Sequence, residues 1–122
     1  MSHKIMLVED DKPILEMMEI LLARIGYEPL IVPDVFEALE IVRKDPPALI
    51  LLDVMMKPID GWEFLEKIRE EYGMKDLPVI LFTASPSVVE RLRTMHDKQL
   101  GFLEKPVDIA DLKAGIAKFL GK

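Results

Sequence analysis

Ala48-Leu49-Ile50-Leu51-Leu52-Asp53 is the stretch of this 122-residue chain that most narrows the fold. Five apolar residues in a row are typical of a strand that is buried on both faces of a parallel sheet. The run ends abruptly at the carboxylate of Asp53. A carboxylate in such a partly buried place needs a partner, because an unpaired buried charge is unfavourable. The stretch therefore predicts a parallel sheet and a polar site at one edge of it.

Outward from this run, short apolar segments alternate with longer segments of helical spacing. The other predicted strands are Ile5–Val8, Leu30–Val32, Val79–Phe82 and Gly101–Leu103, with Ala48–Leu52 as the third of five. Apolar residues recur at helical spacing from Ile14 to Ile25, from Val35 to Val42, at Leu65 and Ile68, and from Ile109 to Phe119. The stretch from Ser87 to His96 has only a ragged stripe, and we expect a marginal or mobile helix there. The alternation predicts one α/β domain over residues 1–122, with helices on both faces of a parallel sheet.

Residues that favour helix ends lie where this pattern needs them. Pro13 suits a first helical turn, and Gly26 suits the end of the first helix. Asp34, with Glu37 three residues later, predicts a capping pair, and Asp108 predicts a cap for the last helix. These signals support the helix positions that the apolar stripes indicate.

Composition excludes several classes of function. Sixteen Lys and Arg against 22 Asp and Glu give a net charge of -6, which argues against direct nucleic-acid binding through phosphate contacts. The sequence has no cysteine, so disulfides, thiol catalysis and cysteine metal sites are excluded. No apolar run approaches the ~20 residues that span a bilayer, and the first residues show no signal-peptide pattern. We therefore expect a cytoplasmic protein with no membrane partner.

Acidic and phosphate-binding residue types follow four of the predicted strands. Glu9-Asp10-Asp11 follow the first strand, Asp53 the third, Thr83-Ala84 the fourth and Lys105-Pro106 the fifth. In open parallel sheets, ligands bind outside the carboxyl ends of the strands. We therefore expect these residues to converge at one edge, although each has an ordinary alternative role. The acidic residues could simply cap a helix, Thr83 could be a common strand-end residue, and Lys105 could be solvated.

Crowded carboxylates predict a divalent cation at this edge. Two neighbouring carboxylates raise each other's pKa unless a cation relieves the repulsion. A few hard oxygen ligands suit Mg²⁺, with Asp10 and Asp53 as the expected direct ligands. We expect Glu9 to bind through a water molecule and the backbone carbonyl of Met55 to complete the set. Asp11 is expected to face solvent.

Thr83, Ala84 and Lys105 supply groups that would hold an anion beside the cation. The Lys105 ammonium suits a phosphate oxygen, and the Thr83 hydroxyl and the Ala84 backbone N–H could donate to others. A carboxylate nucleophile in such surroundings predicts phosphoryl transfer. Other phosphate-binding and catalytic signatures are missing from the sequence: Gly-x-Gly-x-x-Gly, the Walker loop, the serine nucleophile elbow and His-Glu-x-x-His. His3 and His96 are expected to be plain surface residues.

The strand-end motifs together resemble the receiver domain of two-component response regulators. The matching pieces are Val8-Glu9-Asp10-Asp11, Leu52-Asp53-Val54-Met55-Met56 with Asp60-Gly61, Phe82-Thr83-Ala84 and Lys105-Pro106. Each piece alone is a weak signal, but four in this order over essentially the whole chain are specific. The resemblance implies a flavodoxin-like fold with five parallel strands in the order 2-1-3-4-5 and five helices on both faces.

The resemblance also implies roles for individual residues. Asp53 matches the aspartate that a sensor histidine kinase phosphorylates, and Glu9 and Asp10 match the acidic pair that binds Mg²⁺ with it. Thr83 matches the hydroxyl residue that moves to contact the phosphoryl group, and Lys105 matches the lysine that pairs with it. Two further features are the switch aromatic, which is Phe102 here, and a cis bond before the matching proline, Lys105–Pro106.

The sequence departs from the family pattern at two places. Lys57 stands where the family usually has a proline, and Pro58 follows one place later. We expect Lys57 to be solvated rather than to reach the rim of the pocket. Phe102 replaces the commoner tyrosine, so its ring can still turn inward but has no hydroxyl to bond.

These observations predict a phosphorylation switch rather than a metabolic enzyme. The chain would catalyse only its own phosphorylation and slow dephosphorylation, and Met55 and Ser85 would tune the hydrolysis rate. The expected partners are a histidine kinase and an unknown downstream protein, with the chain monomeric or in a weak phosphorylation-linked dimer. The Met1-Ser2 start and the short tail favour a stand-alone, chemotaxis-regulator-like receiver over the N-terminal fragment of a longer regulator.

Two other classes compete with this prediction. A haloacid-dehalogenase-type phosphatase also uses a strand-end aspartate with Mg²⁺, but it needs a second aspartate where this chain has Met55. A degenerate receiver would act as an interaction domain that is never phosphorylated. The presence of Asp10, Asp53, Thr83 and Lys105 argues against that alternative.

Overall fold

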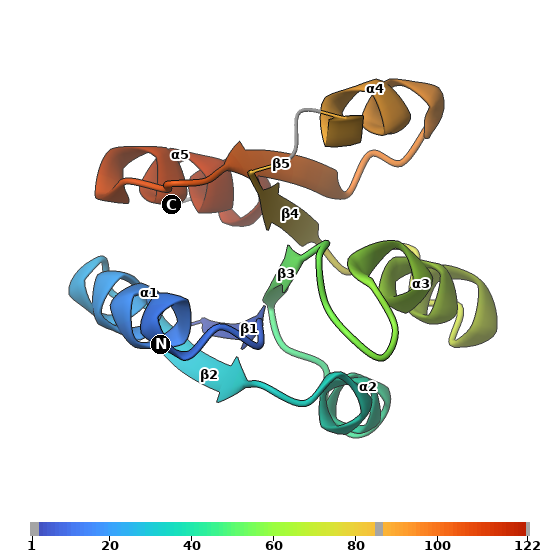
Figure 1. Ribbon diagram of the computed structural model, residues 1–122, viewed down its shortest axis with the longest axis horizontal. Coiled ribbons are helices and arrows are strands. Elements are labelled where there is room, and N and C mark those ends of the chain that lie inside the picture. The colour runs from blue at the N-terminus through green and yellow to red at the C-terminus, as the bar shows by residue number, and fades with distance from the viewer. Residues whose placement is uncertain (1–2, 85–86, 122) are drawn as a thin grey trace.

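The predicted strand around Leu51 lies at the centre of the sheet. The computed structural model describes residues 3–84 and 87–121, and its five parallel strands are ordered β2-β1-β3-β4-β5. The strands are β1 (Lys4–Val8), β2 (Glu28–Val32), β3 (Leu49–Asp53), β4 (Val79–Thr83) and β5 (Leu100–Glu104). The predicted fold class and strand order are therefore confirmed (Figure 1).

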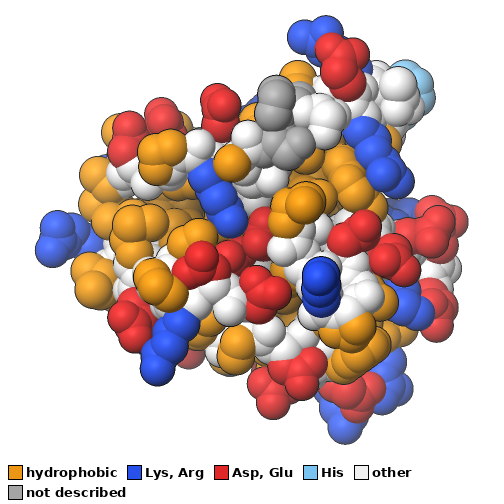
Figure 2. Space-filling model, viewed as in Figure 1, with side chains coloured by type: hydrophobic (Ala, Val, Ile, Leu, Met, Phe, Trp, Pro, Cys, Tyr) orange, Lys and Arg blue, Asp and Glu red, His pale blue; other side chains and the backbone are white. Residues whose placement is uncertain are grey.

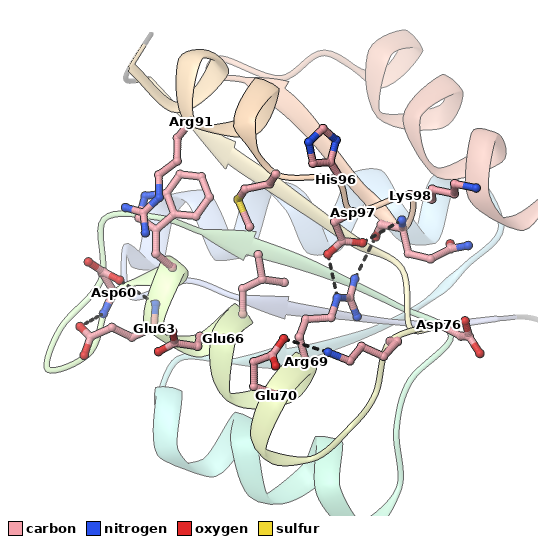
Figure 3. Close-up of a pocket in the computed structure, with 15 residues that line it drawn as sticks. Asp60, Glu63, Glu66, Arg69, Glu70, Asp76, Arg91, His96, Asp97 and Lys98 are labelled. Atoms are coloured by element: carbon pink, nitrogen blue, oxygen red, sulfur yellow. Dashed lines mark hydrogen bonds and ion pairs between the residues drawn. The ribbon is translucent and has the colours of Figure 1, made fainter.

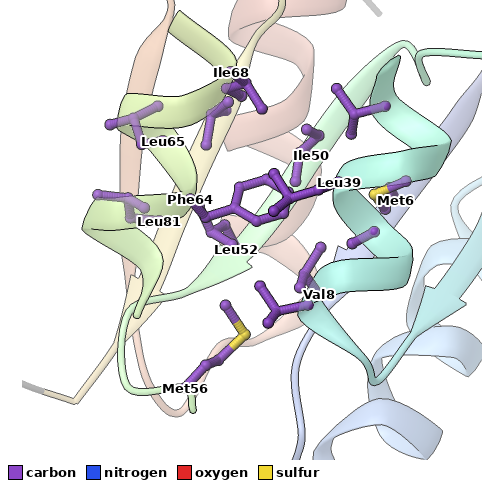
Figure 4. Packing of buried hydrophobic residues seen from close by; sticks show 14 of the residues in the cluster. Met6, Val8, Leu39, Ile50, Leu52, Met56, Phe64, Leu65, Ile68 and Leu81 are labelled. Carbon is purple, nitrogen blue, oxygen red and sulfur yellow. The ribbon is translucent and has the colours of Figure 1, made fainter. Parts of the chain in front are cut away.

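Helices cover both faces of this sheet. They are α1 (Lys12–Arg24), α2 (Val35–Lys44), α3 (Gly61–Glu66), α4 (Ser87–Thr94) and α5 (Ile109–Leu120), and a π-helical turn, η1 (Lys67–Glu71), continues α3. Buried residues of α1 and α5 pack on one face, and buried residues of α2, α3 and η1, with Val88 of α4, pack on the other. On the second face, Phe64 of α3 and Leu39 of α2 lie against the strand residues Ile50 and Leu52 (Figure 4). All four side chains are buried, so the helices are held by apolar contact with the sheet.

Burial separates the central strands from the edge strands. All five residues of β3 and of β4 are buried, as continuous apolar runs predict. Residues of β2 and β5 are mostly half-buried, because each is an edge strand with one neighbour. β2 also begins two residues earlier than predicted and includes Pro29, which an edge strand tolerates because one side of it makes no ladder hydrogen bonds.

Most of the predicted helix ends are confirmed. Pro13 lies in the first turn of α1, Gly26 follows that helix with a φ of 98°, and Asp108 accepts a hydrogen bond from the backbone N–H of Asp111. Asp34 caps α2 by accepting from Phe36, two residues later. The two-way capping pair predicted at Asp34 lies instead at Asp60 and Glu63, at the start of α3.

The π-helical turn η1 was not predicted from the sequence. Ile68 and Arg69 are both buried in it, although they are adjacent in sequence. In a regular helix, neighbouring residues point about 100° apart, so the wider turn changes which side chains reach the interior. The consequence for Arg69 is described below.

Within the part of the chain that the structure describes, no helix combines the length and the apolar character needed to cross a bilayer.

Candidate functional site

Three carboxylates from two strand ends meet at one edge of the sheet. Glu9 and Asp10 follow β1, and Asp53 is the last residue of β3. One carboxylate oxygen from each lies within 4.8 Å of those from the other two. Glu9 and Asp53 are buried, whereas Asp10 is exposed. Acidic side chains gather near the middle of the molecule in the space-filling view (Figure 2). The predicted crowding of residues 10 and 53 is therefore present.

Lys105 is the cation closest to this cluster in the described structure. Its Nζ lies 3.5 Å from Asp53 Oδ1 and 3.6 Å from Glu9 Oε2. It also lies 4.8 Å from the centre of the Phe82 ring, which forms a wall beside it. The Lys105 side chain is 21% exposed, so it reaches the cluster from its solvent side. The solvated alternative for Lys105 is wrong, because this ammonium is shared between two buried carboxylates.

Thr83 and Ala84 lie at the end of β4, as predicted, and Phe102 lies on β5. Thr83 is buried and its backbone carbonyl accepts a hydrogen bond from the backbone N–H of Lys105 at 3.0 Å. Ala84 is exposed, so its backbone is near solvent at the strand end. Phe102 is half-buried and packs against the apolar cluster on the side of α2, α3 and α4. The structure thus brings Thr83 and Lys105 together and places Phe102 on the neighbouring strand.

The remaining predicted residues fall into clear positions. The backbone N–H of Met55 donates to Asp53 Oδ1 at 3.2 Å, and the Met55 side chain is 71% exposed at the mouth of the site. Asp11 is exposed and caps α1 through a hydrogen bond from the backbone N–H of Ile14.

Lys57 is exposed, as expected, and the peptide bonds before Pro58 and Pro106 are both cis. Only the second cis bond was predicted, and Ser85 lies outside the described residues.

Burial changes the acid–base chemistry of Glu9. Burial raises the pKa of Glu9 to about 8, helped by the adjacent Asp53 as a hydrogen-bonding neighbour and as a like charge, whereas Lys105 acts in the opposite direction. Among the described residues, Glu9 Oε2 is the buried side-chain atom without a hydrogen-bond partner. Such an atom is unfavourable unless a proton or a cation satisfies it.

The donor set fits a divalent cation. The three side chains offer hard carboxylate oxygens, which Mg²⁺ prefers over softer ligands, and the exposed position of Asp10 leaves room for water. A cation held by these residues would supply positive charge to the unsatisfied Glu9 oxygen and would reduce the repulsion with Asp53. Glu9, Asp10 and Asp53 are therefore the residues that would hold it.

The raised pKa of Glu9 predicts a stability change with pH in the absence of divalent cations. The Glu9 carboxyl ionises near 4.5 in the unfolded chain and near 8 in the folded chain. Between these values the folded state holds more protons, so the free energy of unfolding should fall as the pH rises. We expect a decrease on the order of a few kcal/mol between about pH 5 and about pH 8. Urea unfolding in EDTA would measure it.

Glu9→Gln is the matched control for this pH dependence, because it keeps the shape of the side chain and cannot ionise. The variant should show a flatter dependence over the same window, and saturating Mg²⁺ should flatten that of the wild type. An unchanged slope in the variant would assign the titration to another group.

Gly61 lies so close to the backbone of Asp53 and Val54 that no larger residue fits there without a shift. The sequence motifs did not indicate this packing role. A Cβ at Gly61 would lie 2.7 Å from the Asp53 carbonyl oxygen and 2.8 Å from Val54 Cα. Its backbone N–H also donates to the Val54 carbonyl at 2.9 Å. The start of α3 is therefore packed directly onto the chain that carries Asp53.

Gly61→Ala should lower the free energy of unfolding by about 1–3 kcal/mol, because the new methyl group meets backbone atoms that cannot turn away. It should also weaken Mg²⁺ binding, since Asp53 must shift. Gly115→Ala is the control: its Cβ would meet side-chain atoms of Leu103 and Ile80 at 3.4 Å and beyond, which is ordinary van der Waals contact, and alanine favours the helix. Urea unfolding and a Mg²⁺ titration followed by Trp62 fluorescence would test both, and equal stabilities would contradict the expectation.

Two hollows in the surface lie at different distances from the acidic cluster. One, of about 280 Å³, is mostly apolar and borders the site, with Ile14 and Met17 of α1 facing Phe82 and Lys105. A larger one, of about 1070 Å³, lies away from the acidic cluster, between α3 with η1 and the segment from α4 to β5. The chemistry therefore lies beside the smaller hollow.

The larger hollow contains a buried arginine that sequence reasoning missed. Arg69 donates from Nε to Asp97 Oδ2 at 2.9 Å and from Nη2 to the Gln99 carbonyl at 3.1 Å (Figure 3). Arg69 also donates from Nη1 to the Met74 carbonyl at 2.7 Å. It is 6% exposed. Two of the three acceptors lie about 30 residues away along the chain, so no local pattern indicated them.

Comparison with known proteins agrees with this geometry. The profile of the family described as "Response regulator receiver domain" matches residues 5–117. The chain is 36% identical over 115 residues to "Probable transcriptional regulator ycf27" of Galdieria sulphuraria, which covers 94% of this chain and 44% of that protein. The chain thus spans less than half the length of such relatives.

Solved structures with the same fold include chemotaxis protein CheY4 of Vibrio cholerae, with a TM-score of 0.85, 26% identity and 98% and 99% of the two chains covered. Another is a CheY-like response regulator receiver domain protein from Methanospirillum hungatei, with a TM-score of 0.86, 26% identity and 99% and 95% covered.

Proposed function

We propose, on the premise that this chain belongs to the response regulator receiver domain family, that it is a phosphorylation switch in which Asp53 is the phosphoacceptor. One observation carries the proposal. Buried Asp53 shares a 4.8 Å carboxylate cluster with Glu9 and Asp10 while Lys105 Nζ lies 3.5 Å from its oxygen. A carboxylate that meets two acidic neighbours and one ammonium is arranged for charge neutralisation during phosphoryl transfer.

The chemistry at Asp53 is a displacement at phosphorus. A carboxylate oxygen of Asp53 forms the new O–P bond while the P–N bond of a phosphohistidine breaks, and the bonding electrons stay on the imidazole nitrogen. The product is an aspartyl phosphate, which water later hydrolyses. When bound, Mg²⁺ supplies positive charge that offsets both the carboxylates and the phosphoryl oxygens.

Residues of this chain hold the reacting groups in place. The Met55 N–H donates to Asp53 Oδ1 and orients the carboxylate. Lys105, now shared by Asp53 and Glu9, would pair with a phosphoryl oxygen, and the Thr83 hydroxyl and the Ala84 N–H would donate to others. Since the Lys105 N–H already bonds the Thr83 carbonyl, a shift at either residue is passed to the other strand end. That link supports a switch that involves the loop after β4, α4 and Phe102.

The apolar hollow beside Lys105 is the surface proposed to meet the phosphoryl donor. The donor is proposed to be a sensor histidine kinase whose helix covers this hollow. Met17 of α1 lines this hollow and is 43% exposed, and Ile20 of the same helix is 59% exposed. Hydrophobic side chains gather over α1 and α5 (Figure 2). The output is proposed to be contact with a downstream protein through α4, β5 and α5, with the chain monomeric or weakly dimeric when phosphorylated. No catalysis beyond its own phosphorylation and dephosphorylation is proposed.

The test is incubation of the wild-type chain with acetyl phosphate or beryllofluoride, with Mg²⁺ and with EDTA. A covalent adduct on Asp53 in intact-mass and peptide analysis, formed with Mg²⁺ and absent with EDTA, is the expected result. Failure of both reagents to react or bind under any condition would favour a degenerate receiver that acts only as an interaction domain.

A further inference from the structure

A close contact between an arginine and a tryptophan side chain joins α3 and α4 at the rim of the larger hollow. The Arg91 guanidinium carbon lies 4.2 Å from the centre of the Trp62 ring. Arg91 is labelled among the residues that line the hollow in Figure 3. Trp62 is in α3 and is half-buried against the apolar cluster, whereas Arg91 is in α4 and is exposed. A guanidinium over an indole face is attracted by the ring quadrupole. We call this pair the Trp62–Arg91 latch.

The two helices that the latch joins follow β3 and β4, the strands that end at Asp53 and Thr83 of the candidate phosphorylation site. Trp62 follows Gly61, which is packed on the backbone of Asp53 and Val54. α4 begins at Ser87, four residues after Thr83 in the sequence. The α3 end of the latch is therefore tied to the phosphoacceptor strand, and the α4 end follows the strand that carries the switch hydroxyl.

α4 buries little of its apolar surface. Of its described residues, Val88 alone is fully buried, with Leu92 only partly buried against the core. The segment that follows α4 is firmly anchored, because Arg69 bonds the Asp97 side chain and the Gln99 carbonyl. α4 is thus attached to a fixed point at its C-terminal side and lightly packed along its length. Such an element has low local stability and can move while the core remains folded.

We propose that the Trp62–Arg91 latch holds α4 in the position that it takes without a phosphoryl group, and so makes Arg91 a positioning residue for the end of β4. This inference rests on the proposed function, because it concerns the equilibrium between the two states of the same site. An interaction made in only one state shifts the equilibrium by its own free energy. Breaking the latch should therefore favour the phosphorylated state and raise the affinity for its analogue.

The expected size follows from the strength of an exposed cation–π pair. Arg91→Met, which keeps the aliphatic stem and removes the cation, should bind beryllofluoride with Mg²⁺ about two- to fivefold more tightly than the wild type. Arg93→Met is the matched control, since Arg93 lies on the same helix, carries the same charge, is 73% exposed and pairs only weakly with Glu90 at 3.8 Å. The control should keep wild-type affinity.

Trp62→Leu tests the latch independently, from its aromatic side. It should raise the affinity to a similar degree as Arg91→Met, and the double variant should gain no more than either single variant, because both substitutions break the same contact. Arg91→Lys should restore part of the wild-type behaviour. A residue with a merely structural role would change stability without this pattern of affinities.

The experiment is a beryllofluoride titration of the full chain with Mg²⁺, followed by fluorine NMR, with urea unfolding to confirm that each variant is folded. Tighter binding by Arg91→Met and Trp62→Leu, but not by Arg93→Met, supports the latch. Equal or weaker binding by the two latch variants, with normal binding by the wild type, overturns the latch and leaves the proposed function in place. Absence of binding by the wild type overturns the proposed function and the latch with it.

Discussion

Asp53→Asn should abolish the Mg²⁺-dependent adduct with acetyl phosphate completely, while the chain stays folded. The amide has nearly the same shape as the carboxylate, so it fits the same buried position at the end of β3. It lacks the anionic oxygen that would attack phosphorus, and it removes one of the three carboxylates that would hold the cation. Intact-mass analysis would measure the loss, and urea unfolding would confirm the fold.

Asp11→Asn is the matched control for that experiment. Asp11 is a neighbouring carboxylate that is exposed and caps α1, and asparagine caps a helix about as well. The control should form the adduct at the wild-type level. An adduct of normal yield on Asp53→Asn would mean that another residue accepts the phosphoryl group and that Asp53 is not the phosphoacceptor.

Arg69→Met should lower the free energy of unfolding by about 3–5 kcal/mol, the usual cost of removing one partner of a buried ion pair. Methionine fills much of the same space but leaves the Asp97 carboxylate and the carbonyls of Met74 and Gln99 without their donor. For a domain whose total stability is about 5–15 kcal/mol, this is a large fraction. Urea or thermal unfolding of both proteins would measure the difference.

Lys75→Met separates this effect from a general loss of positive charge. Lys75 pairs with Glu70 in the same region at 2.8 Å, but both side chains are more than half exposed. Exposed pairs contribute only about 0–1 kcal/mol, so the control should be nearly as stable as the wild type. If both variants lost the same small amount, water would have to replace the donors of Arg69 without penalty.

The contrast between these two arginines, Arg69 and Arg91, suggests how the α4 region can move without unfolding. Arg69 is buried and fixes the segment after α4, whereas Arg91 is exposed and holds the helix itself through one aromatic ring. Because Arg69 holds the segment after α4 firmly and the Trp62–Arg91 latch holds α4 weakly, α4 can move while its C-terminal end stays fixed. The strength of each contact follows from its burial, because solvent weakens the exposed one.

The fold and most of the candidate site could be predicted from the sequence because both depend on local patterns. Continuous apolar runs such as Leu49–Leu52 indicate strands buried on both faces, and helical stripes between them imply a parallel sheet. The carboxyl ends of parallel strands share one edge, so residues that follow separate strands, Asp10, Asp53, Thr83 and Lys105, had to meet there. Chain connectivity alone was enough to group them.

Only the tertiary structure decided the features that depend on helix phase and on contacts distant in sequence. The turn η1 buries Arg69 beside acceptors that lie 28 and 30 residues away, and the packing of α3 against α4 puts Arg91 over Trp62. The unsatisfied oxygen of Glu9 and the contact of Gly61 with the Asp53 backbone likewise appear only once the strands and α3 are packed together. A sequence pattern indicates which face of an element is apolar, but the distances between side chains on different elements are set by how those elements pack.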